Sequence, residues 1–153
     1  MSTPPFDVAR AQRWFAVELN NQAWDLVERE ERSADEVERM IHAAHGACWH
    51  WLEVGDLLNH LRAQNLLATV YAKAGLAEAA VRHAEKCLAL SEEAGDKQTP
   101  FDRATAYGCA AAAYKVAGRM DAARAAFARS EAAAAELEDA ADREVVAKLY
   151  PAA

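Results

Sequence analysis

An internal repeat is the feature that most limits what this chain of 153 residues can fold into. A shift of 43 residues lays the segment 67–75 over the segment 110–118, with a tyrosine, an alanine and a glycine in register. The alanine pair 79–80 falls on the pair 122–123 under the same shift. Similarity at a fixed period of this size is typical of arrays in which each unit is one supersecondary element. The sequence therefore predicts a stack of similar units.

Composition and periodicity indicate that these units are helical. Alanine, the strongest helix former, fills about a quarter of the positions, whereas there are only 6 glycines and 4 prolines. Apolar side chains recur three or four residues apart over 6–30, which predicts a first helix there. Ser33 and Glu36 have the spacing of a capping box, so a second helix should begin near residue 34 and run to Val54, before Gly55.

Glycines and one Thr-Pro step divide the rest of the chain. Gly75, Gly95 and Gly118 should end or separate helices, and Thr99-Pro100 should start one, because threonine caps helices and proline fits the first helical turn. We expect an all-α single domain of six or seven helices. Its parts are a divergent hairpin over 6–54, two repeat hairpins over 58–94 and 99–137, and a capping helix over 138–150.

The spacing inside the repeat resembles that of the tetratricopeptide repeat (TPR). A small residue is followed by tyrosine, glycine and alanine at intervals of three, four and five residues: Ala68, Tyr71, Gly75 and Ala80, then Ala111, Tyr114, Gly118 and Ala123. In that family the small residues let two helices cross closely, and the glycine permits the turn between them. The resemblance covers about residues 62–135, although the unit is longer than the usual 34 residues. It implies antiparallel hairpins stacked as a short right-handed solenoid, and the chain is also similar to bacterial TPR-like proteins with a His- and Trp-rich second helix.

The resemblance also implies a peptide groove. In TPR proteins the first helix of each hairpin lines the concave surface. The register places six polar residues of this chain there: Arg62, Asn65, Thr69, Lys73, Thr105 and Lys115. These positions include three cations and no acid in a chain of net charge −7, so the expected ligand is an acidic peptide or a carboxyl terminus. An ordinary solvated surface with three cations is the alternative interpretation.

A second candidate site lies in the His- and Trp-rich segment 41–51. At 100° per residue, Glu38, His42 and His45 share one helix face, and His50 lies about 80° from His42. Imidazole and carboxylate both suit zinc-like ions, so this segment is an alternative metal or small-ligand site. The competing interpretation is that these histidines pack against tryptophans and form local hydrogen bonds.

The remaining features favour binding over catalysis. The three cysteines form no CxxC pair, and the chain has no GxSxG motif, phosphate loop or dinucleotide fingerprint. The acidic charge disfavours nucleic acid and anionic membranes, and no apolar stretch approaches the roughly 20 residues of a membrane span. We therefore expect a cytoplasmic, non-enzymatic scaffold that binds a protein or peptide and needs no cofactor. Self-association through exposed terminal faces of the solenoid is a further alternative.

Overall fold

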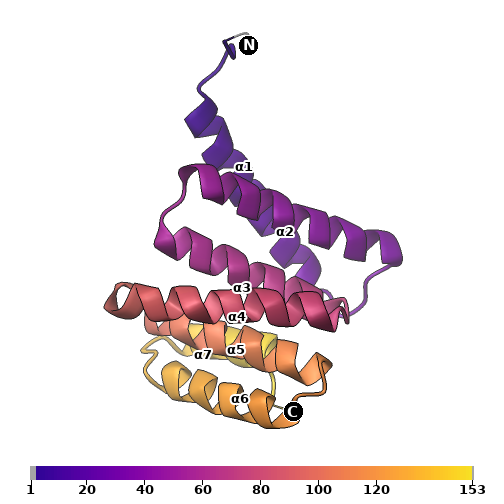
Figure 1. Ribbon diagram of the computed structural model, residues 1–153, viewed down its shortest axis with the longest axis vertical. Coiled ribbons are helices and arrows are strands. Elements are labelled where there is room, and N and C mark those ends of the chain that lie inside the picture. Colours follow the sequence, from indigo (N-terminus) through magenta and orange to yellow (C-terminus); the bar gives the residue numbers. More distant parts are fainter. Residues whose placement is uncertain (1–2, 153) are drawn as a thin grey trace.

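The computed structural model describes residues 3–152 and confirms the predicted all-α architecture (Figure 1). Within that range the chain forms seven α-helices, one short 3₁₀ turn and no strand. The helices are α1 (Val8–Val27), α2 (Ala34–Val54), α3 (Leu57–Lys73), α4 (Ala77–Ala94), α5 (Pro100–Val116), α6 (Met120–Ala135) and α7 (Ala140–Leu149), and the 3₁₀ turn η1 is Gly95–Lys97. None of these helices combines the length and the apolar composition that crossing a membrane requires.

The first six helices form three antiparallel hairpins that stack in chain order (Figure 1). Within each hairpin, α1 packs on α2, α3 on α4 and α5 on α6. Between hairpins, α2 packs on α3 and α4 on α5, and the first helices α1, α3 and α5 are also neighbours. Each unit therefore buries its apolar face mainly against the next one, as in a solenoid.

The two repeat hairpins begin with equivalent caps. The Asp56 side chain accepts from the Asn59 backbone N–H at 3.0 Å, and the Asn59 side chain accepts from the Asp56 N–H at 3.1 Å. Thr99 and Asp102 make the same two bonds, at 3.1 and 3.0 Å, in positions 43 residues further on. The cap at Asp56 is absent from our sequence prediction, because asparagine takes the place of the usual Glu or Gln in the capping box.

The turns inside the two hairpins are also equivalent. Gly75 and Gly118 have φ of 72° and 71°, a left-handed conformation that only glycine adopts without strain. At the first turn the N–H of Leu76 donates to the carbonyl of Tyr71 at 2.9 Å, and the residues 43 positions further on make the same bond at 2.9 Å. This is the hydrogen-bond pattern of a Schellman helix end. The 43-residue period is therefore a period of the backbone as well as of the sequence.

The period extends into the helix contacts. The Cys87 thiol of α4 donates to the carbonyl of Leu61 in α3 at 3.6 Å, and the Ser130 hydroxyl of α6 donates to the carbonyl of Ala104 in α5 at 2.7 Å. Small side chains at these contacts let the two helices of a hairpin approach closely. The four alanines of the repeat pattern are all buried, as the close-crossing interpretation requires: Ala68, Ala80, Ala111 and Ala123.

The last helix, α7, does not only cover the last hairpin, as a simple end cap would. α7 packs against α5 and α6, and in Figure 1 it lies behind α5. Two of its residues reach further: Lys148 lies 3.8 Å from Glu28 at the end of α1, and Leu149 packs against both core clusters. The C-terminal end of α7 therefore runs along the first helices of the hairpins, on the surface that the resemblance marks as the groove.

Candidate functional site

The chain's own C-terminal segment fills part of the predicted groove. Tyr150, which follows α7, is 4% exposed. Its hydroxyl oxygen accepts from the Asn65 amide at 3.1 Å, and the same amide donates to the carbonyl of Thr105 at 2.8 Å. The Tyr150 and Thr69 hydroxyls are 2.8 Å apart. Because Thr69 donates to the carbonyl of Asn65 at 2.9 Å, Tyr150 must be the donor to Thr69. Burial raises the pKa of Tyr150 well above its ordinary value, so this donor stays protonated.

Gly108 makes room for the Tyr150 ring. A Cβ at position 108 would lie 2.6 Å from Cγ of that ring, inside any normal contact distance. Gly108 occupies the position of α5 that Asn65 occupies in α3, since the two are 43 residues apart. The second repeat therefore supplies an open surface for the ring, whereas the first repeat supplies the polar partner of its hydroxyl.

Replacing Gly108 with alanine should lower the free energy of unfolding by about 1–3 kcal/mol, because the new methyl group collides with an aromatic ring held by two hydrogen bonds. Gly46→Ala is the matched control. Its Cβ would collide only with Cδ1 of Leu19, 2.7 Å away at the end of a flexible side chain, while Cγ of the same residue lies at 3.8 Å, an ordinary contact. There the gain in helix propensity, up to about 1 kcal/mol, should offset the cost. Urea denaturation of both variants measures the difference, and equal effects would show that Tyr150 is free to move.

Arg62, another predicted groove residue, is tied to the next hairpin. Its guanidinium donates to both carboxylate oxygens of Asp102, at 2.8 and 3.1 Å. Burial raises the pKa of Asp102, but hydrogen bonds from Arg62 and Thr99 outweigh it and leave this pKa below its ordinary value. The pair is a link between α3 and α5, so Arg62 has little freedom to bind a ligand. Thr105 is also engaged, since its buried hydroxyl donates to the carbonyl of Phe101 at 2.9 Å.

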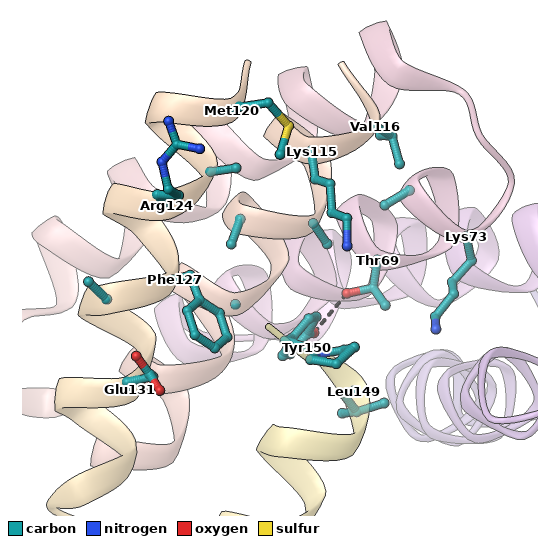
Figure 2. A pocket seen from close by; sticks show the side chains of 17 residues that line it. Thr69, Lys73, Lys115, Val116, Met120, Arg124, Phe127, Glu131, Leu149 and Tyr150 are labelled. Atoms are coloured by element: carbon teal, nitrogen blue, oxygen red, sulfur yellow. Dashed lines mark hydrogen bonds between the residues drawn. The ribbon is translucent and has the colours of Figure 1, made fainter. Parts of the chain in front are cut away.

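The two predicted lysines, in contrast, border a cavity. Lys73 and Lys115 line a space of about 630 Å³ that adjoins Tyr150 and is shown in Figure 2. Within residues 3–152 neither lysine forms an ion pair. Burial and the nearby Arg32 lower the pKa of Lys73. The apolar walls come from four helices and the segment after α7, and include Ala72, Ala111, Val116, Met120, Phe127 and Leu149.

Helix α6 contributes residues to this cavity that our sequence prediction missed. Arg124 and Glu131 line it, and Phe127 forms the wall between them (Figure 2). Arg124 also pairs with Asp121 at 2.5 Å, so its charge is partly satisfied. The family register assigns groove residues only to the first helices of the hairpins, and it therefore gives no signal for residues on α6.

The predicted metal ligands are not brought together. Within residues 3–152 no three His, Cys, Asp or Glu side chains are placed to hold a metal ion. Glu38 and His42 are exposed, and His42 borders a hollow lined by α1 and α2. His50 forms a hydrogen bond with Gln12 and stacks on Phe15, with ring centroids 5.4 Å apart. His50 thus packs against an aromatic ring, but that ring is Phe15 and not one of the tryptophans of the competing interpretation, and its hydrogen-bond partner Gln12 is 38 residues away along the chain.

His45 belongs to a different polar cluster, which joins α2, α3 and α4. Its Nε2 is 2.7 Å from the Tyr71 hydroxyl, and its ring meets the ring of His83 edge to face at 5.8 Å. His83 stacks in parallel on Tyr71, with the ring centroids 5.4 Å apart. Tyr71 and His83 therefore both contact His45, although the sequence predicted neither of them as its partner.

The protonation of His83 follows from its neighbours. The Gln64 amide donates to the sulfur of Cys48 at 3.6 Å, so its oxygen is the group that faces Nδ1 of His83 at 2.8 Å, and Nδ1 must carry the proton. The other ring nitrogen, Nε2, lies 3.4 Å from the Arg82 guanidinium, a cation that opposes a second proton. Burial and then Arg82 lower the pKa of His83 to about 4. This histidine is therefore neutral near pH 7.

All three cysteines, Cys48, Cys87 and Cys109, are free and buried. Burial raises the pKa of Cys48, and a hydrogen bond with Cys109 together with burial raises that of Cys87. A thiol that is buried and has a raised pKa is a poor nucleophile.

Comparisons of the chain with protein-family models, curated proteins and solved structures each gave no match. Its function must therefore be inferred from the geometry described above. At the cavity beside Tyr150, charged side chains face open apolar space, whereas the histidines 45 and 83 form hydrogen bonds with Tyr71 and Gln64 of the chain itself.

Proposed function

We propose that this protein is a non-catalytic scaffold of the tetratricopeptide kind, and that it binds an acidic peptide segment in the cavity between α3, α5, α6 and the end of α7. The observation that carries the proposal is the pair Lys73 and Lys115, which border an apolar cavity of about 630 Å³ without a carboxylate partner in residues 3–152. Ligand sites commonly have volumes of about 300–1,000 Å³, apolar walls and a few polar groups.

The equivalent caps, turns and helix contacts of the two repeat hairpins support the family assignment. Gly75 and Gly118 adopt the same left-handed conformation after helices of equal length. The first hairpin fits the period only in part: α2 begins 43 residues before α4, but α1 ends at Val27 without a glycine turn. The family assignment therefore rests on the second and third hairpins.

The occupied part of the groove supports a peptide as the ligand. Leu149 and Tyr150 are a short stretch of polypeptide that presents apolar side chains to α3 and α5 while a hydroxyl meets Asn65. A segment from another protein that enters the adjoining cavity would extend the same kind of contact. Apolar side chains of the ligand would face Phe127, and its acidic groups would face the lysines.

The charges support an acidic ligand. The chain has a net charge of −7, so cations left without partners at a cavity stand out against the overall field. Burial disfavours the charged form of Lys73, and a carboxylate placed beside it would favour that form again. Lys73 and Lys115 are exposed, but they border apolar walls, so an acidic group should bind more strongly at this cavity than at a lysine that borders no cavity.

Reversing both lysines tests the proposal. Lys73→Glu together with Lys115→Glu should weaken the binding of acidic peptides at least about tenfold, because each change replaces an attraction with a repulsion. The probes are immobilised peptides of about a dozen residues that combine aromatic residues with Asp and Glu, and the same peptides with Asn and Gln. Affinities are measured by surface plasmon resonance.

The matched control is Lys86→Glu with Lys97→Glu, which changes the net charge equally at exposed positions of α4 and η1. It should leave the affinities within about twofold. Arg62 is unsuited to this test, because its reversal would break the bond with Asp102. Equal losses in the two double variants, or equal binding of the neutral peptides, would refute the proposed site.

A further inference from the structure

The two ends of the hairpin stack differ in polarity. Apart from Met120, which lines the cavity, the exposed side of α6 carries alanines and charged residues: Arg124, Ala125, Ala128, Arg129 and Ala132. The first hairpin instead exposes a series of large apolar side chains. A solenoid needs polar outer faces on its terminal units to stay soluble, and only the α6 end meets that requirement. The stack therefore has a polar outer face at its α6 end and an apolar outer face at its α1 end.

We call the apolar outer face of the first hairpin the N-terminal aromatic surface. It comprises the exposed apolar residues of the N-terminal half of α1, with the preceding Phe6, and those near the end of α2. The side chains of Phe6, Trp14 and Trp49 are 62%, 58% and 63% exposed. In Figure 1 the N-terminal half of α1 extends beyond the stacked helices, near the end of α2. The full set is Phe6, Val8, Trp14, Phe15, Val17, Trp49 and Leu52.

Contacts within the hairpin hold this surface in place. Trp14 meets Phe15 edge to face at 5.0 Å, and Phe15 stacks on His50 of α2. Arg13 donates to the carbonyl of Val54 at 3.0 Å, which ties α1 to the end of α2. A partner would therefore meet aromatic side chains that are already ordered, and ordering costs at the interface would be small.

The area is suited to a stable interface. An aromatic side chain has roughly 150–250 Å² of surface, so these seven residues together leave on the order of 600 Å² of apolar area exposed. That is at the upper end of the largest apolar patch on ordinary monomers. It also approaches the roughly 800 Å² that each partner contributes to a standard interface. Charged residues around this surface would supply the rest of the interface area.

The neighbouring charges fit a second copy of the same chain. Arg10 and Glu18 lie one helical turn on either side of Trp14, so all three share a face of α1. If two copies of α1 cross antiparallel about a two-fold axis near Trp14, Arg10 of each copy faces Glu18 of the other. A two-fold interface requires such a self-complementary pattern. Neither residue forms an ion pair within residues 3–152.

We propose that two copies of this chain associate through their N-terminal aromatic surfaces, with the α1 helices antiparallel and Trp14 near the two-fold axis. A head-to-tail arrangement is disfavoured, because the α6 end offers alanines and charges to the aromatic side chains. The proposal does not rest on the peptide cavity, which is formed by α3, α5, α6 and the end of α7.

Sedimentation equilibrium of the full chain tests the association. At about 100 µM, where even a micromolar dimer is populated, the wild type should have twice its mass of 16.7 kDa. Trp14→Glu should weaken the dimer about 30-fold or more, since a central tryptophan is a typical hot spot. The variant should stay folded, because Trp14 is mostly exposed, and circular dichroism checks this. Ala125→Glu with Ala132→Glu on α6 is the control and should dimerise like the wild type.

Charge reversal tests the antiparallel arrangement. Arg10→Glu alone and Glu18→Arg alone should each weaken self-association severalfold, because each opposes like charges across the axis. A mixture of the two single variants should form a mixed dimer, since both pairs are then of opposite charge. A monomeric wild type would overturn the proposal, and so would a mixture that associates no better than the single variants. Loss of the dimer in the α6 control would indicate head-to-tail stacking instead.

Discussion

Tyr150→Ala should destabilise the protein by about 3–5 kcal/mol, the usual cost of removing a buried aromatic side chain. The ring is 4% exposed, packs on Gly108 and belongs to the main core cluster. Its loss also leaves the Asn65 amide and the Thr69 hydroxyl with one buried partner fewer. Because most other residues of α7 are exposed, the helix should detach. Urea denaturation measures the stability, and hydrogen exchange at residues 140–149 reports the detachment.

Two further variants separate the causes. Tyr150→Phe keeps the ring and removes only the hydroxyl, so it should cost about 1–2 kcal/mol and leave the exchange protection of α7 largely intact. Val145→Ala removes an exposed apolar side chain from the same helix and should change the stability by less than about 0.5 kcal/mol. If Tyr150→Ala behaved like Val145→Ala, the groove would not depend on the C-terminal segment.

The sequence predicts the helices from local signals and their stacking from the 43-residue repeat. The box of Ser33 and Glu36 and the turn at Gly75 each involve residues within a few positions of one another. The small differences are at helix ends: α1 spans 8–27 instead of 6–30, and α6 ends at Ala135 instead of 137. Helix ends depend on the last few hydrogen bonds, which periodicity does not resolve.

The occupation of the predicted groove by Tyr150 could not be predicted in the same way, because this residue comes from far along the chain. Asn65 and Tyr150 are 85 residues apart, and no local pattern marks their contact. The register places Arg62 in the groove as a cation that could bind a ligand, but its guanidinium pairs with Asp102, 40 residues away. The Asp102 carboxylate also accepts from the Thr99 N–H in the capping box of α5. One indirect signal exists. Gly108 interrupts a helix that has no need of a glycine, and this indicates that another group approaches closely.

The same limit explains the histidines. Helix geometry places Glu38, His42 and His45 on one face, yet the sequence does not show what that face meets. In the structure α4 places His83 beside His45 of α2, and Tyr71 of α3 contacts both histidines. Tyr71, which belongs to the repeat pattern, is thus also the hydrogen-bond partner of His45.

The histidine cluster should make the stability of the fold depend on pH. The pKa of His83 falls from 6.5, its ordinary value, to about 4 in the folded chain. Between these two pH values the unfolded chain binds more protons, so the free energy of unfolding should decrease as the pH falls from about 6.5 to 4. The expected loss is about 3 kcal/mol, with no further change from this group below about pH 4 or above about pH 7. Urea denaturation across this range measures it.

His83→Gln removes this titrating group and should reduce the slope between pH 4 and 6.5, although some slope should remain because burial also lowers the pKa of His45. The variant should be less stable than the wild type at pH 7, because the bond to Gln64 is changed. The slope, not the absolute stability, is therefore the test. His42→Gln, at an exposed position of α2, should keep the wild-type slope.

Asp102 affects the stability in a different pH range: because its pKa is lowered, it stabilises the fold above about pH 4, and this contribution is lost at lower pH. An unchanged slope in His83→Gln would mean that another group carries the acid sensitivity above pH 4.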